Sequence, residues 1–314
     1  MNQTILVTGA AGLLGANFSR HLLSNNYKVL GIDNLSGGYE DFLPKHPNFK
    51  FFKLDLDNKE SLKCIFESHK PSTVFHFAAY AAEGLSPFIR NFNYTNNVIA
   101  SVNVINECIN HNCKIVFTSS MAVYGNQDPP FSEDQSLMPI DPYGIAKMTV
   151  EQDIRQAHEQ FGLRYNIVRP HNVVGIYQNM WDKYRNAISI FIRRALEGED
   201  IIVYGDGEQT RAFSDIEYCM EPFLKLISGY DGETFNIGAD KYFTINEMAH
   251  KIKDLSPLKS INIVHGDKRH EAVHAYCSHD KAKNMLDFKD DTDIDTLINK
   301  MYNWATKQKP RSIK

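Results

Sequence analysis

The sequence predicts an α/β fold in which a doubly wound parallel sheet is joined to a smaller, mixed α/β lobe. Short apolar or β-branched runs alternate with longer stretches of helical period through the first half of the chain. A glycine-rich turn directly follows the first run. Strand, helix and strand in repetition are typical of a parallel sheet covered on both faces. The expected strands are residues 4–8, 28–33, 49–54, 73–77, 114–118 and 164–169.

Two helices of the sheet domain carry apolar stripes that are expected to face the core. The first helix is expected to begin near Gly12. Its helical period places on the core-facing side Leu13, Leu14, Phe18, Leu22 and Leu23. The other runs from Tyr143 to Phe161 and is expected to bury Ile145, Met148, Ile154 and Phe161.

After Arg169 the alternation loosens, and Pro and Gly residues separate shorter segments. The expected elements there are a helix at 184–196, a strand at 201–204 and helices at 246–255 and 292–306. We expect a sheet domain of residues 1–172 with a returning segment near 213–238, and a smaller lobe of residues 173–212 and 239–314. No linker-like stretch separates them, which favours a broad interface with a cleft.

Composition excludes several classes of function. The net charge of −4 and the sequence pI near 6.3 argue against nucleic acid or an anionic membrane as a partner, and favour a small-molecule substrate. The five cysteines form no CxxC pair and no His/Cys ligand spacing, so neither a metal site nor a disulfide framework is expected. The start of the chain lacks a signal-like or spanning apolar stretch, and we therefore expect a cytoplasmic protein.

The turn after the first strand has the pattern of a dinucleotide site. Gly9, Gly12 and Gly15 lie between a strand and an amphipathic helix, where a pyrophosphate must approach backbone N–H groups. Asp33 ends the second strand and can accept both ribose hydroxyls of NAD, whereas it would repel the 2′-phosphate of NADP. A turn without a ligand, with Asp33 as a local cap, is the alternative. The pattern predicts a Rossmann-type domain that binds NAD.

A tyrosine and a lysine four residues apart suggest acid–base chemistry. Tyr143 and Lys147 share one helix face. The reference pKa of tyrosine is about 10, and bringing it near neutrality takes roughly 4 kcal/mol, which an ammonium and the positive nicotinamide can supply together. Lys147 could also hold the nicotinamide ribose. Ser119 and Ser120 end a strand, where parallel-sheet ligands bind. The spacing alone also fits a polar surface pair.

Together these motifs resemble one family along nearly the whole chain. The chain is similar to the extended short-chain dehydrogenases/reductases of the NAD-dependent nucleotide-sugar epimerase/dehydratase family, and within it most of all to the UDP-glucose 4-epimerases. The similarity rests on the glycine turn, the Ser, Tyr and Lys, and the segments 76–79, 169–175, 204–216 and 235–249.

The resemblance implies roles for further residues. It makes Ser120, Tyr143 and Lys147 catalytic. It assigns to the cofactor, besides these glycines and Asp33, the residues Leu13, Leu14, Asn34, Asp55, Leu56, Ala78, Ala79, Tyr80, Asn97, Ser119, Tyr143, Lys147 and Pro170. It assigns to a nucleotide-diphosphate sugar Glu83, Ser120, Tyr143, His171, Asn172, Arg211 and Arg269, although the segment around Arg269 departs from the family pattern. A packed, hydrogen-bonded histidine is the alternative for His171. The resemblance also implies a homodimer through helices 91–111 and 143–161.

The residues beside Ser120 favour one reaction within this family. Relatives that eliminate water or decarboxylate carry carboxylates where this chain has Met121 and Ala122, which cannot exchange protons. This absence favours a 4-epimerase of the UDP-glucose/UDP-galactose type. A 4-dehydrogenase that releases a keto-sugar, a dehydratase and a non-catalytic NAD-binding protein are the alternatives. Glu83 would disfavour a uronate, whereas Arg90 would argue the opposite; the nucleotide and the hexose stay open.

Overall fold

The structure, a computed structural model, describes residues 3–182, 184–258, 260–268 and 274–312. Its strands are β1 (Thr4–Thr8), β2 (Lys28–Asp33), β3 (Phe49–Lys53), β4 (Thr73–His76), β5 (Lys114–Thr118), β6 (Tyr165–Pro170), β7 (Val173–Val174), β8 (Ile201–Tyr204), β9 (Thr210–Ala212), β10 (Ser214–Asp215), β11 (Thr234–Ile237), β12 (Tyr242–Thr244), β13 (Ile263–Gly266) and β14 (His274–Ala275).

The helices are α1 (Leu13–Ser24), α2 (Lys59–His69), α3 (Arg90–Tyr94), α4 (Ala100–Asn110), α5 (Pro142–Phe161), α6 (Ala187–Glu197), α7 (Ile216–Lys225), α8 (Ile245–Leu255), α9 (Asp280–Leu286) and α10 (Ile294–Ala305). Short 3₁₀ turns are η1 (Glu40–Phe42), η2 (Glu83–Phe88) and η4 (Met121–Val123), and a π-helical turn is η3 (Thr95–Ile99).

The large sheet is parallel throughout, in the order β11-β6-β5-β4-β1-β2-β3. The doubly wound α/β fold is therefore confirmed, and the predicted strands lie within one residue of the observed bounds. β11 was not among the predicted strands. It follows α7 and joins the edge of the sheet beside β6.

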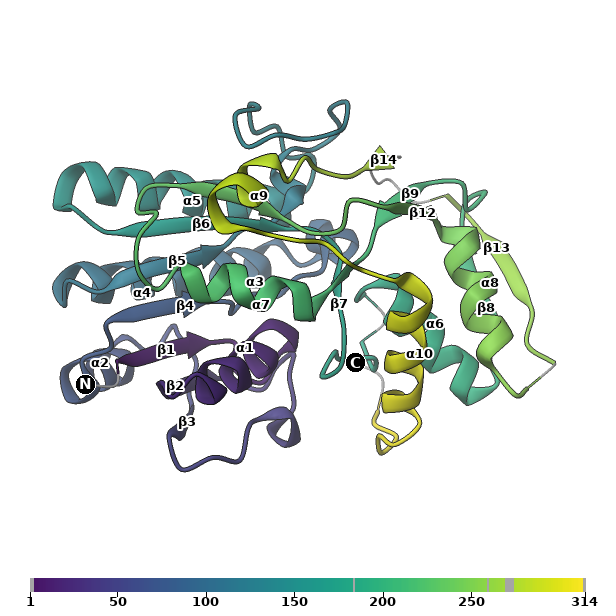
Figure 1. The fold of residues 1–314 in the computed structure, drawn as a ribbon, viewed down its shortest axis with the longest axis horizontal. Helices are drawn as coiled ribbons and strands as arrows, with labels where there is room; N and C mark the ends of the chain where they lie inside the picture. Colours follow the sequence, from purple (N-terminus) through teal and green to yellow (C-terminus); the bar gives the residue numbers. More distant parts are fainter. Residues whose placement is uncertain (1–2, 183, 259, 269–273, 313–314) are drawn as a thin grey trace.

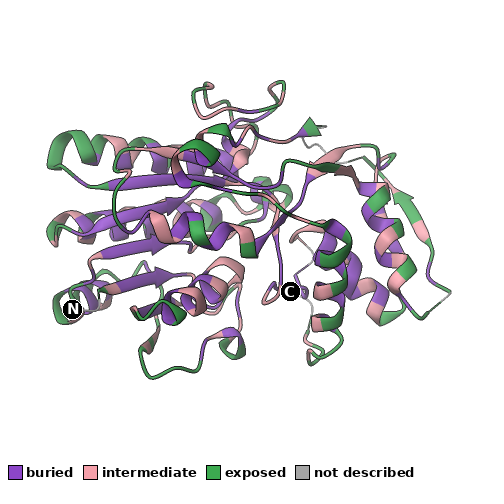
Figure 2. Ribbon diagram, viewed as in Figure 1, coloured by how far each residue is buried: buried purple, intermediate pink, exposed green. Residues whose placement is uncertain are grey.

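Alternation along the strands builds a core on each face of the sheet. In β1, Ile5 and Val7 point to a core that includes Phe18 of α1 and Phe223 of α7, whereas Leu6 points to the core under α2, α4 and α5. Strands β1, β2, β4, β5, β6 and β11 are buried almost throughout (Figure 2), as expected of a parallel sheet between two helical layers (Figure 1), whereas the edge strand β3 is only partly covered.

Local signals set the ends of α5, the helix that carries Tyr143 and Lys147. The Asp141 side chain accepts a hydrogen bond of 2.9 Å from Gly144 N, Pro142 occupies the first turn, and Gly162 ends the helix with φ 71°. One prediction for this helix is wrong: Phe161 is 65% exposed, because it lies in the last turn.

The smaller lobe lies to the right in Figure 1, where α6, α8 and α10 pack around the parallel pair β8 and β13. Its core also contains Ala16 and Phe42 from the first part of the chain, so the two parts share one interface. The helix predicted at 184–196 begins later, at Ala187, because the Asn186 side chain caps it by accepting a hydrogen bond of 3.0 Å from Ile188 N. The predicted helix 91–111 is α3, η3 and α4 in succession.

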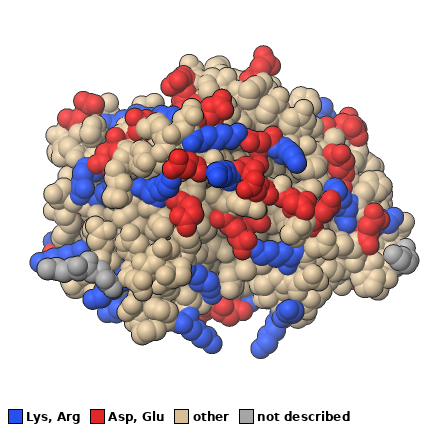
Figure 3. Space-filling view, viewed as in Figure 1, with Lys and Arg blue, Asp and Glu red and all other residues tan. Residues whose placement is uncertain are grey.

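The surface carries charged side chains of both signs. Acidic and basic side chains are intermingled on the face shown in Figure 3. Within the described ranges, no helix has the length and apolarity that a bilayer crossing requires. Nor does any group of three or more His, Cys, Asp and Glu side chains there converge as metal ligands.

Candidate active site

A cleft of about 980 Å³ runs along the carboxyl edge of the large sheet and reaches into the smaller lobe. The carboxyl ends of parallel strands meet at one edge, so the ends of β2, β5 and β6 and the residues directly after β1 and β4 all contribute to its wall. The opposite wall comes mainly from α6, β8 and β9. The cleft therefore joins residues from most of the chain.

The glycine turn forms the floor of this cleft at the start of α1. Gly9 has φ 68°, and its carbonyl accepts a hydrogen bond of 3.0 Å from Gly12 N. A Cβ on Gly15 would lie only 2.1 Å from the Gly9 carbonyl oxygen. No side chain caps the N-terminus of α1. The turn thus leaves helix N–H groups beside a groove that only glycine keeps open, which fits a pyrophosphate.

Asp33 stands at the end of β2 and organises the adjoining loop. Its carboxylate accepts hydrogen bonds from Ala11 N at 2.9 Å and Leu35 N at 2.7 Å, while the residue also lines the cleft. Burial raises its pKa, and these two bonds oppose that effect. Beyond it, Asn34 donates a hydrogen bond of 2.9 Å to Asp55. A carboxylate so placed can accept ribose hydroxyls, and it also serves as the local cap that was the alternative role.

Most predicted cofactor residues line the cleft: Gly9, Gly12, Leu13, Leu14, Gly15, Asp33, Asn34, Asp55, Leu56, Ala78, Ala79, Tyr80, Ser119, Tyr143, Lys147 and Pro170. Asn97 does not line it, which corrects its predicted position. The Asn97 side chain instead accepts a hydrogen bond of 2.8 Å from Tyr80 N and donates one of 3.2 Å to Tyr80 O. Asn97 therefore holds the Tyr80 backbone in place.

Ser120, Tyr143 and Lys147 come together in the cleft and are 8%, 6% and 2% exposed. Lys147 Nζ donates a hydrogen bond of 2.7 Å to Thr118 O and lies 5.9 Å from the centre of the Tyr143 ring. Ser120 precedes η4, and its side chain accepts a hydrogen bond of 3.1 Å from Ala122 N. β5 and α5 thus place a hydroxyl, a phenol and an amine within one pocket.

Burial dominates the electrostatics of this group. It raises the pKa of Tyr143, the Glu83 carboxylate adds to the effect, and the Ser120 hydroxyl opposes it. It also lowers the pKa of Lys147 to about 7, against the opposing charge of Glu151. In the protein alone Tyr143 is therefore a neutral phenol, so a further positive charge in the cleft is needed before it can act as a base.

Three further residues predicted for the substrate also lie in this cleft. Glu83, Asn172 and Arg211 all line it. Asn172 has φ 40° and follows the end of β6, and Arg211 projects from β9, whose strand pairs with β12 and β14. Arg269, the remaining arginine predicted for the substrate, lies outside the described residues.

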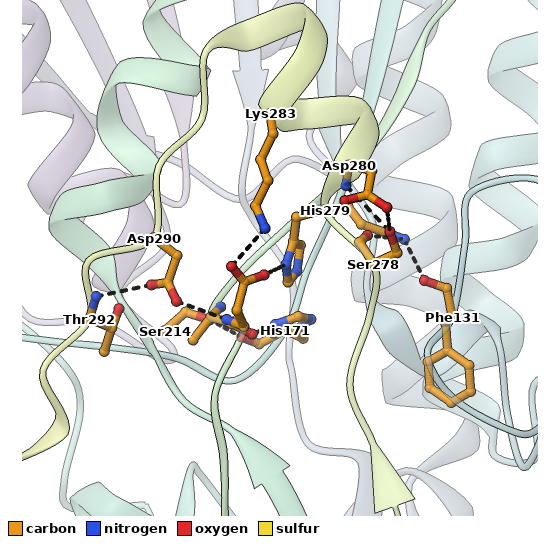
Figure 4. Close-up of polar contacts among 12 residues, drawn as sticks. Phe131, His171, Ser214, Ser278, His279, Asp280, Lys283, Asp290 and Thr292 are labelled. Atoms are coloured by element: carbon orange, nitrogen blue, oxygen red, sulfur yellow. Dashed lines mark hydrogen bonds and ion pairs between the residues drawn. The ribbon is translucent and has the colours of Figure 1, made fainter.

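His171 does not face the cleft, which corrects its assignment to the substrate. It is 1% exposed, its Nε2 lies 3.2 Å from Ala239 O, and its ring centre lies 4.8 Å from that of His279 (Figure 4). His279 in turn contacts Asp240 at 2.8 Å. Burial, followed by the charge of His279, lowers the pKa of His171 to about 3. His171 is therefore the packed, hydrogen-bonded histidine that was its alternative role.

Further cleft residues were missed in the sequence analysis. They include Gln178, Asn179, Arg185, Asn186, Phe191 and Tyr204. Asn186 and the first-turn residue Ala187 both line the cleft, so the positive N-terminal end of α6 lies at the cleft wall. An asparagine directly before an apolar helical period is an N-cap signal. This signal predicts that the helix starts directly after Asn186. It also predicts that the N-terminus of this helix, like that of α1, favours an anion.

Comparison with known proteins agrees with this geometry. The sequence profile described as "NAD dependent epimerase/dehydratase family" matches residues 5–238. The chain belongs to this family. It is 31% identical to a putative UDP-glucose 4-epimerase of Methanocaldococcus jannaschii, over 96% of this chain and 97% of the relative.

Solved structures extend the similarity to the whole fold. A Thermotoga maritima UDP-glucose 4-epimerase with UDP-glucose matches with a TM-score of 0.92 and 28% identity, covering 97% of this chain and 99% of that one. A Bacillus cereus UDP-glucuronic acid 4-epimerase with UDP-glucuronic acid and NAD matches with a TM-score of 0.89 and 26% identity, with the same coverage. The chain is therefore an NAD-dependent enzyme with nucleotide-sugar epimerase/dehydratase activity.

The glycine turn predicts a specific effect on cofactor binding. We expect Gly15→Ala to weaken NAD binding about tenfold or more, because the new methyl must displace the Gly9 carbonyl and the turn that meets the pyrophosphate. Equilibrium titration with NAD measures this. Gly84→Ala is the matched control, since a Cβ there meets nothing within 4 Å. NAD affinity within twofold of wild type in Gly15→Ala would contradict the assignment.

Proposed function

We propose that this chain is an NAD-dependent 4-epimerase of a nucleotide-diphosphate hexose, of the UDP-glucose/UDP-galactose type. The proposal rests on which residues surround Ser120. Tyr143 and Lys147 share its pocket, whereas the adjacent Met121 and Ala122 offer no group that exchanges protons. These parts suffice for oxidation and re-reduction at one carbon, but provide no second acid or base for elimination.

The first half-reaction follows from the positions of these side chains. Tyr143 Oη takes the proton of the sugar C4 hydroxyl, while the Ser120 hydroxyl hydrogen-bonds the same oxygen. NAD held along the glycine turn and Asp33 would supply the hydride acceptor and donor for C4. Positive charge of the Lys147 ammonium stabilises the Tyr143 phenolate, and burial of both groups strengthens that interaction.

Inversion requires the 4-keto sugar to turn within the cleft. Asn172, Arg211 and the N-terminus of α6 are placed to hold the diphosphate while the hexose rotates about it. With the opposite face of C4 turned toward the site where NAD would supply the hydride, Tyr143 gives its proton back to the C4 oxygen. Atoms and electrons balance over the cycle, and the product differs from the substrate only at C4.

Charges near Tyr143 support a neutral hexose. Glu83 lines the cleft and acts electrostatically on Tyr143, so a uronate carboxylate would meet repulsion there. Arg185 also lines the cleft, but its Nε contacts Asp182 at 3.1 Å and its guanidinium lies 5.0 Å from the centre of the Tyr80 ring. This arginine is therefore already paired with an acidic residue.

A substrate panel tests the proposed reaction directly. We expect the purified protein, without added cofactor, to interconvert the C4 epimers of one or more UDP-, GDP-, CDP- or dTDP-hexoses, with no net NADH. NMR follows the sugar, and absorbance follows NADH. UDP-glucuronate should be the poorer substrate. A stable keto-sugar with accumulating NADH would instead identify a dehydrogenase, and the absence of turnover across the panel would contradict the proposal.

Tyr143 should be indispensable for turnover and dispensable for the fold. We expect Tyr143→Phe to lower kcat about 10³-fold or more, because it removes the atom that carries the proton, while bound NAD is retained. Tyr218→Phe, on α7 and outside the cleft, is the matched control. Steady-state epimerisation with NAD content measured in parallel makes the comparison. Wild-type kcat in Tyr143→Phe would refute the mechanism.

We also propose a homodimer through the helices α3, α4 and α5. Phe92 of α3 and Ile99 of η3 are 44% and 49% exposed on this side of the molecule, and apolar side chains of that size favour a covered surface. Light scattering at micromolar concentration measures the mass. A single-subunit mass would contradict the dimer.

A further inference from the structure

A buried charged cluster lies next to the active site without touching the cleft. It consists of Tyr124, Glu151 and Arg169, which are 0%, 0% and 2% exposed. None of the three lines the cleft. Each of the three is close in sequence to a residue that lines the cleft. Tyr124 lies four residues after Ser120, and Glu151 lies one helical turn after Lys147. Arg169 directly precedes Pro170. The proposed mechanism gives this cluster no role.

The cluster is held by close hydrogen bonds. The Arg169 guanidinium donates two hydrogen bonds to the Glu151 carboxylate, from Nε to Oε1 at 2.9 Å and from Nη2 to Oε2 at 2.7 Å. Arg169 Nη1 donates to Tyr124 Oη at 2.8 Å. A bidentate arginine–carboxylate pair is geometrically specific as well as strong. The three residues therefore fix the relative positions of α5, β6 and the segment after β5.

The cluster extends to the edge of the sheet. The Tyr124 hydroxyl donates to Asn236 Oδ1 of β11 at 2.7 Å, and Asn236 N donates to Glu133 Oε1 at 2.7 Å. Arg169 Nη1 also donates to the Glu133 carbonyl at 3.2 Å. The phenol of Tyr124 is thus both an acceptor and a donor, and removing it would break the connection between Arg169 and β11.

The charge of Glu151 reaches Lys147 along the helix. Burial would raise the pKa of Glu151, but the hydrogen bonds and charge of Arg169, a hydrogen bond from Ser119 and the charge of Arg155 together outweigh it, so the pKa is lowered and the carboxylate is ionised. Arg155, one helical turn further along α5, donates a hydrogen bond of 3.0 Å to Glu151 Oε2. Burial lowers the pKa of Lys147 to about 7, and Glu151 acts in the opposite direction. Removing a buried partner charge in such surroundings has a large effect, because little water screens it.

The other groups that face Lys147 do not replace Glu151. The Phe117 ring centre lies 4.7 Å from Nζ, and Thr118 contributes a carbonyl. Tyr143 is a phenol whose pKa is raised by burial. His76 of β4 is neutral, because burial and the charge of Lys147 lower its pKa to about 3. Glu151 is therefore the ionised partner that supports the ammonium.

We propose that Glu151, Arg169 and Tyr124 form a positioning unit that places a buried carboxylate one helical turn from the Lys147 amine and holds Ser120 and Lys147 in register with Tyr143, a role that rests on the proposed epimerase mechanism. Glu151 supplies the charge. Arg169 and Tyr124 supply the geometry, since they connect the segments that carry the three catalytic side chains. These are positioning residues, because none of them reaches the cleft.

The charge is tested by titrating Lys147 itself, without reference to turnover. Competitive labelling of the holoenzyme with trace acetic anhydride, read by mass spectrometry of the Lys147 peptide, gives the pH midpoint of the amine. We expect Glu151→Gln to lower that midpoint by about one pH unit, because one supporting charge is lost. Glu159→Gln, an exposed neutralisation on the same helix, should leave it unchanged. Equal midpoints in wild type and Glu151→Gln would overturn the charge role.

The geometry is tested by Tyr124→Phe, which removes two hydrogen bonds and no charge. We expect kcat for epimerisation to fall about tenfold, with KM within about threefold and the Lys147 midpoint unchanged. Tyr218→Phe is again the control. A lowered melting temperature with wild-type kcat would show that Tyr124 contributes only to stability, and would overturn the positioning role. Should Glu151→Gln not fold, as circular dichroism would show, the double variant Glu151→Gln/Arg169→Gln, which leaves neither charge of the buried pair, replaces it in the titration of Lys147, and an unchanged midpoint would overturn the charge role.

The two proposals fail in different ways. If the wild-type enzyme turned over no nucleotide sugar, the proposed function would be wrong, and the labelling midpoint would still measure the link between Glu151 and Lys147. If epimerisation were found but neither variant changed its expected readout, the positioning unit would be wrong and the proposed function would stand.

Discussion

The parallel pairing of β1 between β2 and β4 is the constraint on which the rest of the structure depends. Parallel strands end at the same edge, so the turn after β1, the carboxylate after β2 and the backbone after β4 are brought together there. The approach is close: a Cβ on Gly9 would lie 2.8 Å from Ala78 N. The cofactor groove is therefore a consequence of strand order together with the absence of side chains at that turn.

Burial decides which groups at this edge are charged. Lys147 and His76 lie deep enough that burial lowers both of their pKa values, and Tyr143 lies deep enough that burial raises its own. In such a setting each retained charge needs a partner, and the Arg169–Glu151 pair is the clearest example. Ser120, Tyr143 and Lys147 are buried in the cleft, which suits the proposed reaction, whose proton and hydride must not be lost to water.

The parts of the site that could be predicted are those with local signals. The glycine turn, Asp33 at a strand end, and the Tyr143–Lys147 spacing each depend on a few neighbouring residues, and all of them line the cleft. His171 shows where such reasoning stops. Consecutive side chains at the end of a strand point to opposite sides, and the sequence did not indicate that Pro170 and Asn172 would face the cleft while His171 packed against His279.

By itself, the sequence determined the α/β class, the dinucleotide groove and the candidate acid–base groups of the cleft, because these follow from periodicity, from glycine and from side-chain chemistry. Only the tertiary structure decided that β11 completes the sheet, that Asn97 supports Tyr80 and that α6 opens on the cleft. It alone paired Glu151 with Arg169 and joined both to Tyr124. The physical reason is that pairing between distant segments depends on how helices pack on the sheet, and no spacing along the chain encodes which buried charges will meet.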